Sequence, residues 1–139
     1  MSPPSPRIAK THYELLSAFR HALRRFQHFS REAARNAGLT PQQHQALLAI
    51  KGFPGRDYVS VGELAERLQL KHHSAVGLVN RLAQRQFVLR TPSAIDRRRQ
   101  DVSVTAKGEK LISRLSEAHL RELRSLRPEL RRLLESMPE

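Results

Sequence analysis

Residues 60–104 read SVGELAERLQLKHHSAVGLVNRLAQRQFVLRTPSAIDRRRQDVSV, and the order of helix and strand signals in this segment indicates the fold class. Ser60, followed three residues later by Glu63, fits a capping box, so a helix is predicted to open directly after Ser60. Apolar residues then recur at helical spacing at Val61, Leu64, Ala65 and Leu68. Residues 69–71 form a three-residue turn, and a second helix is predicted from about His72 to Gln86. The apolar stripe expected to pack this second helix is Ala75/Val76, Val79 and Leu82/Ala83.

Two strands are expected after these helices, at Phe87–Thr91 and Gln100–Val104. The second strand alternates Val102 and Val104 with polar residues, which is typical of a half-buried strand. The loop between the strands carries three consecutive arginines at 97–99. Two short helices joined by a tight turn, followed by a hairpin with a basic tip, predict a winged helix-turn-helix over residues 40–104.

The segments on both sides of this stretch are predicted to be helical. From Thr11 to about Asn36 there is no Pro or Gly, and apolar residues lie three and four apart, so a long amphipathic helix is expected. Gly38 is expected to end it. Thr40 to Gln43 then supplies an N-cap and a helix-opening proline for a further helix. A short extended piece is expected at 57–59.

Thr105 is expected to cap the last helical region, which carries a near-heptad seam. The seam consists of Ile112, Leu115, His119, Leu123, Leu126, Leu130, Leu133 and Met137, and such spacing predicts a partner helix. Pro128 is expected to break or kink this region into two helices. The predicted fold class is therefore mostly α with a small β-hairpin wing.

Composition limits the classes of protein. The 139 residues suit a single domain, and no run of 18 apolar residues exists for a membrane-spanning helix. Residues 1–10 are expected to be a disordered lead-in without a secretory signal, and a cytoplasmic location is the simple interpretation. The absence of cysteine excludes disulfides, thiolate metal sites and a thiol-oxidation switch.

The charge is strongly basic and unevenly placed. The formal net charge is +12, and 20 of the 25 cationic side chains are Arg. Residues 67–99 hold eight Lys and Arg against Asp96 alone. A basic stretch of this kind indicates a polyanionic partner, with nucleic acid favoured over a membrane surface, although a merely very soluble protein is the competing interpretation.

The second helix of the helix-turn-helix is expected to expose a face rich in hydrogen-bond donors. The DNA-binding residues predicted on this recognition helix are Lys71, His72, His73, Ser74, Gly77, Asn80 and Arg81. On the wing they are Arg90, Asp96, Arg97, Arg98 and Arg99, because consecutive arginines suit a narrow, electronegative minor groove. The helix opened by Ser60 presents backbone N–H groups that can hold a DNA phosphate.

The order of LTPQQHQALLAI, VGELAERL, SAVGLVNRL, SAIDRRR and VTAKG resembles the MarR family of bacterial transcriptional regulators. The resemblance extends from about Tyr13 to Leu134, and the Asp-Arg-Arg wing followed by Thr-x-x-Gly is its most specific part. It departs from the family where Lys71 stands at the opening of the recognition helix, a position that often holds Ser or Thr.

The resemblance implies one domain over 11–139 and a two-fold symmetric homodimer, with helices at 11–37 and 105–139 forming the dimer lobe. The expected interface residues are Leu15, Phe19, Leu123, Leu126, Leu130 and Leu133. By motif position, Asp96 would shape the wing and pair with Arg81, while Arg98 would enter the minor groove and Arg97 or Arg99 would contact phosphate. Some members bind small aromatic acids, so such a ligand stays open here, with no residue assigned to it.

The chemistry of an enzyme or a metal site is not indicated. No phosphate-binding glycine loop, Ser/His/Asp set or catalytic carboxylate pair stands out. His72 and His73 point about 100° apart on a helix and cannot easily share one ion, so no metal or cofactor is expected.

We therefore expect a sequence-specific double-stranded DNA-binding regulator, more specifically a homodimeric repressor of a palindromic operator. The alternatives are a low-specificity nucleoid-type DNA-binding protein and a winged-helix protein-interaction module. An RNA-binding winged helix is disfavoured because the basic elements offer no exposed aromatic platform.

Overall fold

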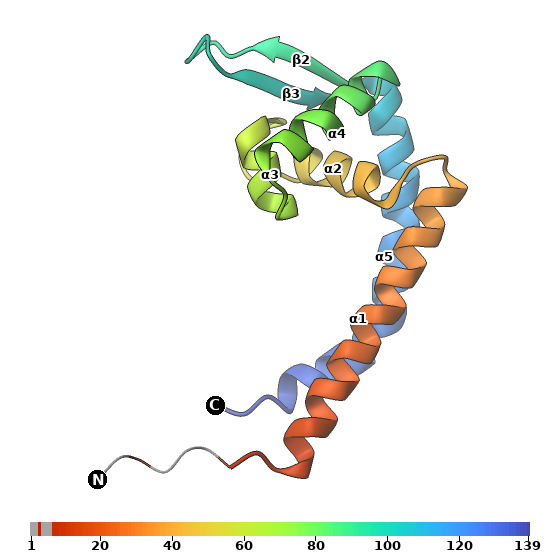
Figure 1. The fold of residues 1–139 in the computed structure, drawn as a ribbon. Helices are drawn as coiled ribbons and strands as arrows, with labels where there is room; N and C mark the ends of the chain where they lie inside the picture. The colour runs from red at the N-terminus through yellow and green to blue at the C-terminus, as the bar shows by residue number, and fades with distance from the viewer. Residues whose placement is uncertain (1–2, 4–6) are drawn as a thin grey trace. The chain divides into compact units, whose positions relative to one another are not determined.

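The computed structural model describes residues 3 and 7–139 (Figure 1). Its helices are α1 (Lys10–Asn36), α2 (Pro41–Lys51), α3 (Val61–Leu68), α4 (His72–Gln84) and α5 (Ala106–Glu135). Its strands are β1 (Tyr58–Ser60), β2 (Val88–Pro92) and β3 (Gln100–Val104). The expected class, mostly helical with a small β wing, is confirmed. The expected disorder of residues 1–10 falls partly on residues outside those described, and α1 begins at Lys10.

The chain divides into two compact units. Unit 1 comprises residues 1–30 and 118–139, and unit 2 comprises residues 31–117. Unit 2 therefore holds α2, α3, α4 and the sheet, whereas unit 1 consists of the first part of α1 and the second part of α5.

Local capping fixes the helix starts of unit 2 where the sequence predicted them. Thr40 Oγ1 accepts from Gln43 N at 3.1 Å, and the Gln43 side chain accepts from Thr40 N at 3.1 Å. Ser60 and Glu63 make the same reciprocal pair at 3.1 and 2.9 Å. Thr105 Oγ1 accepts from Gly108 N at 3.1 Å at the start of α5. The two reciprocal pairs each satisfy two backbone donors, and Thr105 satisfies one, that a helix start would otherwise leave without partners.

The sheet has three strands in the order β1-β3-β2, all antiparallel. β2 and β3 form the hairpin seen at the top of Figure 1, with Val88 opposite Val104. The pairing of β1 with β3, which sets Val59 opposite Val102, was not predicted. A three-residue strand is too short to show an alternating pattern in the sequence. Both paired valines are completely buried in the core of unit 2.

The core of unit 2 lies between α2, α3, α4 and the sheet. Its fully buried side chains include Leu47, Ile50, Leu64, Leu78, Leu82 and Val59. The predicted stripe of α4 is confirmed at Ala75, Val79 and Leu82, but it was wrong at Val76, which is exposed, and it omitted Leu78. The buried face of α4 therefore includes Leu78 and not Val76. The reason is that α4 packs against two helices and β2 and not against a single surface.

The glycine of the Thr-x-x-Gly motif permits a close approach of α5 to the start of the wing. A Cβ at Gly108 would stand 2.4 Å from the Phe87 carbonyl oxygen and 2.9 Å from Val104 Cγ1. The Thr105 hydroxyl ties the same place, donating to the Gln86 carbonyl at 2.6 Å. Any side chain at residue 108 would force backbone apart, so the spacing of this motif has a packing reason.

The predicted break at Pro128 is wrong, because α5 runs without interruption through this residue to Glu135. A proline inside a helix removes one backbone hydrogen bond and clashes with the preceding turn, at a cost of about 3 kcal/mol. Here the cost is offset by packing on both sides, since Leu126 and Leu133 are buried and Glu129 pairs with Arg25 at 3.1 Å. Pro128 itself is exposed, so water can satisfy the carbonyl it frees.

In unit 1 the two helical segments lie side by side (Figure 1). Ala22, Leu126 and Leu133 are its buried apolar side chains. His119, an expected seam residue, is buried with its ring edge-on to Phe26 and Phe29, and its Nε2 lies 2.9 Å from Ser30 Oγ. The polar end of this ring is thereby satisfied inside the unit.

Candidate nucleic-acid interface

The exposed face of α4 carries the side chains predicted for DNA recognition. Lys71, His72, His73, Ser74 and Arg81 are exposed, and Gly77 and Asn80 are half-buried. Lys71 occupies the N-cap position with extended backbone, φ −67° and ψ 151°, and its side chain makes no capping hydrogen bond. The departure from Ser or Thr at this position therefore removes a cap and adds a cation without moving the helix start from His72.

Gly77 and Arg81 are neighbours one turn apart on this face. A Cβ at Gly77 would lie 3.2 Å from Arg81 Nη1. The absence of a side chain at Gly77 thus leaves room for the Arg81 guanidinium to lie along the helix. No side chain of residue 77 projects from the middle of the exposed face.

Arg90 on β2 reaches α4 and donates from Nη1 to Asn80 Oδ1. Because a guanidinium only donates, this bond fixes the oxygen of the Asn80 amide toward Arg90 and leaves its NH₂ group to donate elsewhere. Both residues were predicted separately as DNA-binding, and their contact was missed. It links residues ten apart on different elements, and nothing in their local sequence indicates it.

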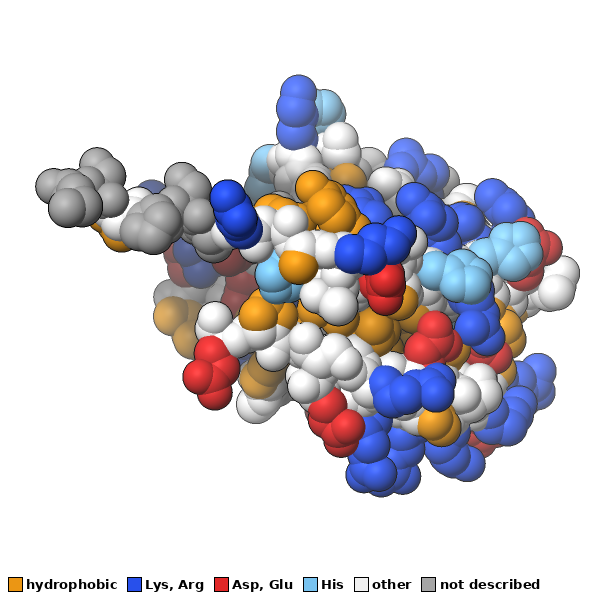
Figure 2. Space-filling model, turned by 90° about the horizontal axis from the view of Figure 1, so that it is seen from below, with side chains coloured by type: hydrophobic (Ala, Val, Ile, Leu, Met, Phe, Trp, Pro, Cys, Tyr) orange, Lys and Arg blue, Asp and Glu red, His pale blue; other side chains and the backbone are white. Residues whose placement is uncertain are grey.

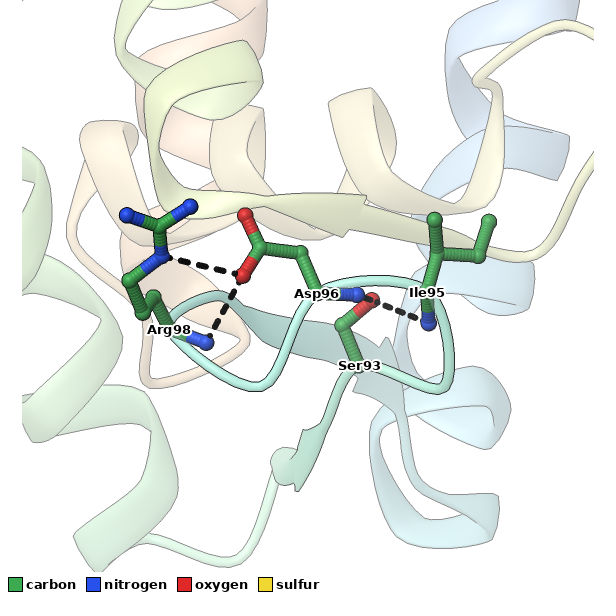
Figure 3. Close-up of polar contacts among 4 residues, drawn as sticks. All are labelled: Ser93, Ile95, Asp96 and Arg98. Atoms are coloured by element: carbon green, nitrogen blue, oxygen red, sulfur yellow. Dashed lines mark hydrogen bonds and ion pairs between the residues drawn. The ribbon is translucent and has the colours of Figure 1, made fainter.

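The wing loop is held by its own hydrogen bonds (Figure 3). The Asp96 carboxylate accepts from Arg98 N at 3.0 Å and from Arg98 Nε at 3.4 Å. The Ser93 hydroxyl accepts from the N–H groups of Ile95 and Asp96 at 3.2 and 3.3 Å. The expected pairing of Asp96 with Arg81 is therefore corrected, because the carboxylate is used within its own loop, where its partner is two residues away.

The wing arginines point outward. Arg97, Arg98 and Arg99 are all exposed, and the side chain of Arg98 is 92% exposed although its Nε contacts Asp96. Asp96 therefore aims the base of the Arg98 side chain and leaves the guanidinium tip in solvent. This exposure makes the tip available to a narrow anionic groove.

The start of α3 is reinforced by a residue that the sequence interpretation did not single out. Arg56 donates to the Glu63 carboxylate, and its guanidinium lies 4.4 Å from the centroid of the Phe53 ring and 5.0 Å from that of Tyr58. The Ser60 backbone N–H, and secondarily Arg56, hold the pKa of Glu63 below its ordinary value of 4.5. The sequence did hold a signal for this role of Arg56, because it stands between two aromatic residues and seven residues before the capping Glu63.

The expected interface residues all lie in unit 1, where their exposure differs. Phe19 and Leu123 are 48% and 40% exposed, and Leu15 and Leu130 are half-buried. Leu126 and Leu133 are buried within the chain itself. Together with Ala22, Leu23 and Phe26, most of these residues line a shallow apolar groove of about 120 Å³.

Among residues 3 and 7–139, no three His, Asp or Glu side chains group in a way that could hold a metal ion. Over the same residues, none of the helices combines the length and the apolar character that crossing a membrane requires.

Comparison with known proteins identifies a family for the segment that holds α2, α3, α4 and β2. Residues 37–99 match the model of the MarR family. A Thauera aromatica protein named for transcriptional regulation of the hcr operon is 30% identical over 97 residues, which are 70% of this chain and 57% of that protein. The Bacillus subtilis HTH-type transcriptional repressor MdtR is 32% identical over 78 residues, covering 56% of this chain and 48% of MdtR. The chain thus spans about half the length of the curated relatives it matches.

The fold has solved counterparts. A MarR family protein from Bacillus stearothermophilus superposes with a TM-score of 0.76 at 24% identity, covering 87% of this chain and 82% of that one. At this identity the likeness establishes the fold.

Proposed function

Because this chain belongs to the MarR family, we propose that it is a sequence-specific double-stranded DNA-binding transcriptional regulator that acts as a repressor. The observation that carries the proposal is the pairing, within unit 2, of an exposed donor-rich face on α4 with three outward arginines on the wing. A helix with such a face fits the major groove, and arginines at a hairpin tip fit the adjacent minor groove.

Each element has a distinct part in this proposal. The first turn of α4, with Lys71 to Ser74, contacts base edges and phosphates, while Arg98 enters the minor groove. The capping box at Ser60 uses the N–H groups of Ser60 and Glu63. The N–H groups of Val61 and Gly62, which have no acceptor within a helix, are then left to bind a phosphate at the start of α3.

A homodimer formed through unit 1 would place two such faces on one duplex. Its support is the apolar surface of this unit, where Phe19, Leu23 and Leu123 stay at least 40% exposed beside the shallow groove. Hydrophobic side chains are also visible at the surface drawn in Figure 2, interspersed with Lys and Arg. Two-fold symmetry implies a palindromic site with half-sites about 10 base pairs apart.

Release by a small ligand would follow from the same geometry. A ligand that binds better to a dimer with another separation of its two α4 helices would lower DNA affinity by shifting the population. Direct binding assays with small aromatic acids, followed by DNA competition, would test this step. Ligand binding with no change in DNA affinity would count against it.

The experiment for the main proposal is selection of bound sequences from a random duplex library at near-physiological salt, with the Arg98→Ala protein in parallel. We expect a palindrome from the wild type and a loss of about 1–3 kcal/mol in binding for Arg98→Ala. Tight, salt-sensitive binding without any motif would instead support a nucleoid-type protein. No retention of DNA, or identical behaviour of the Arg98→Ala protein, would support a protein-interaction module.

A further inference from the structure

One apolar side chain stands at the tip of the basic wing. Ile95 is 92% exposed, more than any other large apolar side chain in the described residues. Single exposed apolar residues are common on protein surfaces and by themselves indicate nothing. Ile95 differs from them in how firmly its backbone is held and in which charges surround it.

The loop that carries Ile95 is closed on itself. The Ser93 hydroxyl accepts from the N–H groups of both Ile95 and Asp96. The Ser93 N–H donates to the Arg99 carbonyl at 3.0 Å, and the Arg99 N–H donates to the Asp96 carbonyl at 2.9 Å. This network fixes the backbone on both sides of Ile95. The side chain is therefore presented to solvent at little further cost in conformational entropy when a partner binds it.

Ile95 shares its side of the loop with the most exposed arginine. In Figure 3 the side chains of Ile95, Asp96 and Arg98 all project to the same side of the loop. Arg98 is likewise 92% exposed, and Arg97 and Arg99 flank it. Asp96 lies between Ile95 and Arg98 in this view, and its carboxylate orients the arginine.

From this geometry we propose that Ile95 is a minor-groove wedge, which inserts beside Arg98 and selects flexible pyrimidine–purine steps under the wing. The inference rests on the proposed DNA-binding function and adds a specificity-determining residue to it. The arginines are drawn to the phosphates and to the electronegative groove floor, which brings the rigid apolar tip against the base edges. Apolar wedges that part a base step are favoured where stacking is weakest, at TA and CA/TG steps.

A protein partner for Ile95 is less well supported. Three arginines around a single isoleucine would have to be desolvated or paired on binding an apolar protein surface, which is costly. The minor groove satisfies both kinds of side chain together, because its walls are sugars and its rims are phosphates.

The test uses the full chain and duplexes recovered by the wild type from the random library, with 2-aminopurine placed at successive positions under the wing. The variants are Ile95→Ser, which removes the apolar volume, and Ile95→Leu, which keeps it. Leu89→Ser is the matched control, because Leu89 is 55% exposed on β2 of the same wing but lies outside the loop. Since Ile95 is exposed, thermal unfolding should be the same in all variants.

The wild type should raise 2-aminopurine fluorescence at one step, where the base is unstacked. Ile95→Ser should abolish that rise and weaken binding about tenfold, as expected for losing much of a buried isoleucine contact. Ile95→Leu should retain both properties, and Leu89→Ser should change neither.

Two results would overturn the inference in distinguishable ways. If Arg98→Ala weakens binding while Ile95→Ser leaves affinity, base preference and fluorescence unchanged, the wedge is wrong and the proposed function stands. The wedge is equally wrong if the wild type raises fluorescence at no position. If the wild type binds no duplex, the inference and the proposed function fail together.

Discussion

Units 1 and 2 differ most in where their apolar side chains lie. In the described residues, unit 2 buries seventeen apolar side chains and leaves four large ones exposed, among them Ile95. Unit 1 buries three and leaves nine large ones exposed. Both units are basic, so charge does not explain the contrast.

Unit 2 buries its apolar side chains through its own contacts, whereas unit 1 does not. Helices α2 to α4 and the sheet cover one another, and their capping boxes satisfy the helix starts. Two helical segments side by side in unit 1 can cover only one face of each other, so the remaining apolar stripe faces solvent. We therefore expect unit 1 to bind a second copy of the chain and unit 2 to bind DNA.

The largest expected effect is from opening the core of unit 2. Leu82 is 0% exposed, and Leu82→Ala should lower the free energy of unfolding by about 2–5 kcal/mol, because a cavity forms where packing cannot collapse. Urea unfolding followed by circular dichroism measures it. Leu120→Ala in unit 1 is the matched control, since Leu120 is 56% exposed and its loss should cost well under about 1 kcal/mol. Equal losses would contradict the contrast between the units.

The close approach at Gly108 gives the next effect. Gly108→Ala should destabilise unit 2 by about 1–3 kcal/mol, because the new methyl group meets the Phe87 backbone at 2.4 Å. At Gly62 the nearest atom to an added Cβ is 3.9 Å away, so Gly62→Ala should be neutral or slightly stabilising. Thermal unfolding of the two variants would separate packing from helix propensity, and a neutral Gly108→Ala would refute the packing reason.

The exposed stripe of unit 1 can be changed without touching the buried side chains of unit 2. Phe19→Glu combined with Leu123→Glu should weaken self-association by roughly 1–3 kcal/mol per buried polar group and yield monomers with weakened DNA binding. Light scattering across a concentration series measures the mass. The control, Leu89→Glu, places a carboxylate on the exposed wing strand and should leave self-association intact. A dimer that survives the double substitution would exclude this face of unit 1 as the interface.

The smallest effect concerns pH at the start of α3. Because the pKa of Glu63 is lowered in the folded state, its carboxylate contributes stability that is fully present above 4.5 and is lost as pH falls through the lower folded value. Glu63→Gln keeps an acceptor for the Ser60 N–H but removes the charge. It should cost less than about 1 kcal/mol at neutral pH and flatten the acid side of the stability curve. Unfolding free energies at neutral pH and near pH 3 would check this, and an unchanged acid slope would count against it.

Features decided by neighbouring residues could be predicted from the sequence. The capping residues Thr40, Ser60 and Thr105 were identified because a cap needs only four consecutive residues. The hairpin and its basic tip were likewise evident, as both depend on a short alternating run and a loop. The DNA-binding residues and the dimer contacts stay predictions, because they concern molecules that lie outside the chain.

Tertiary structure decided what depends on distant partners. Pro128 remains helical because buried leucines on both sides hold α5, and β1 exists because β3 offers it a partner. Asp96 pairs with Arg98 and not with Arg81, because the tight wing loop brings the backbone N–H and the side chain of Arg98 to the Asp96 carboxylate. Local pattern therefore determined where helices start and where positive charge gathers. The packing of residues far apart in the sequence determined the features for which the local sequence gave only a weak preference. A short segment of sequence carries no information about such packing.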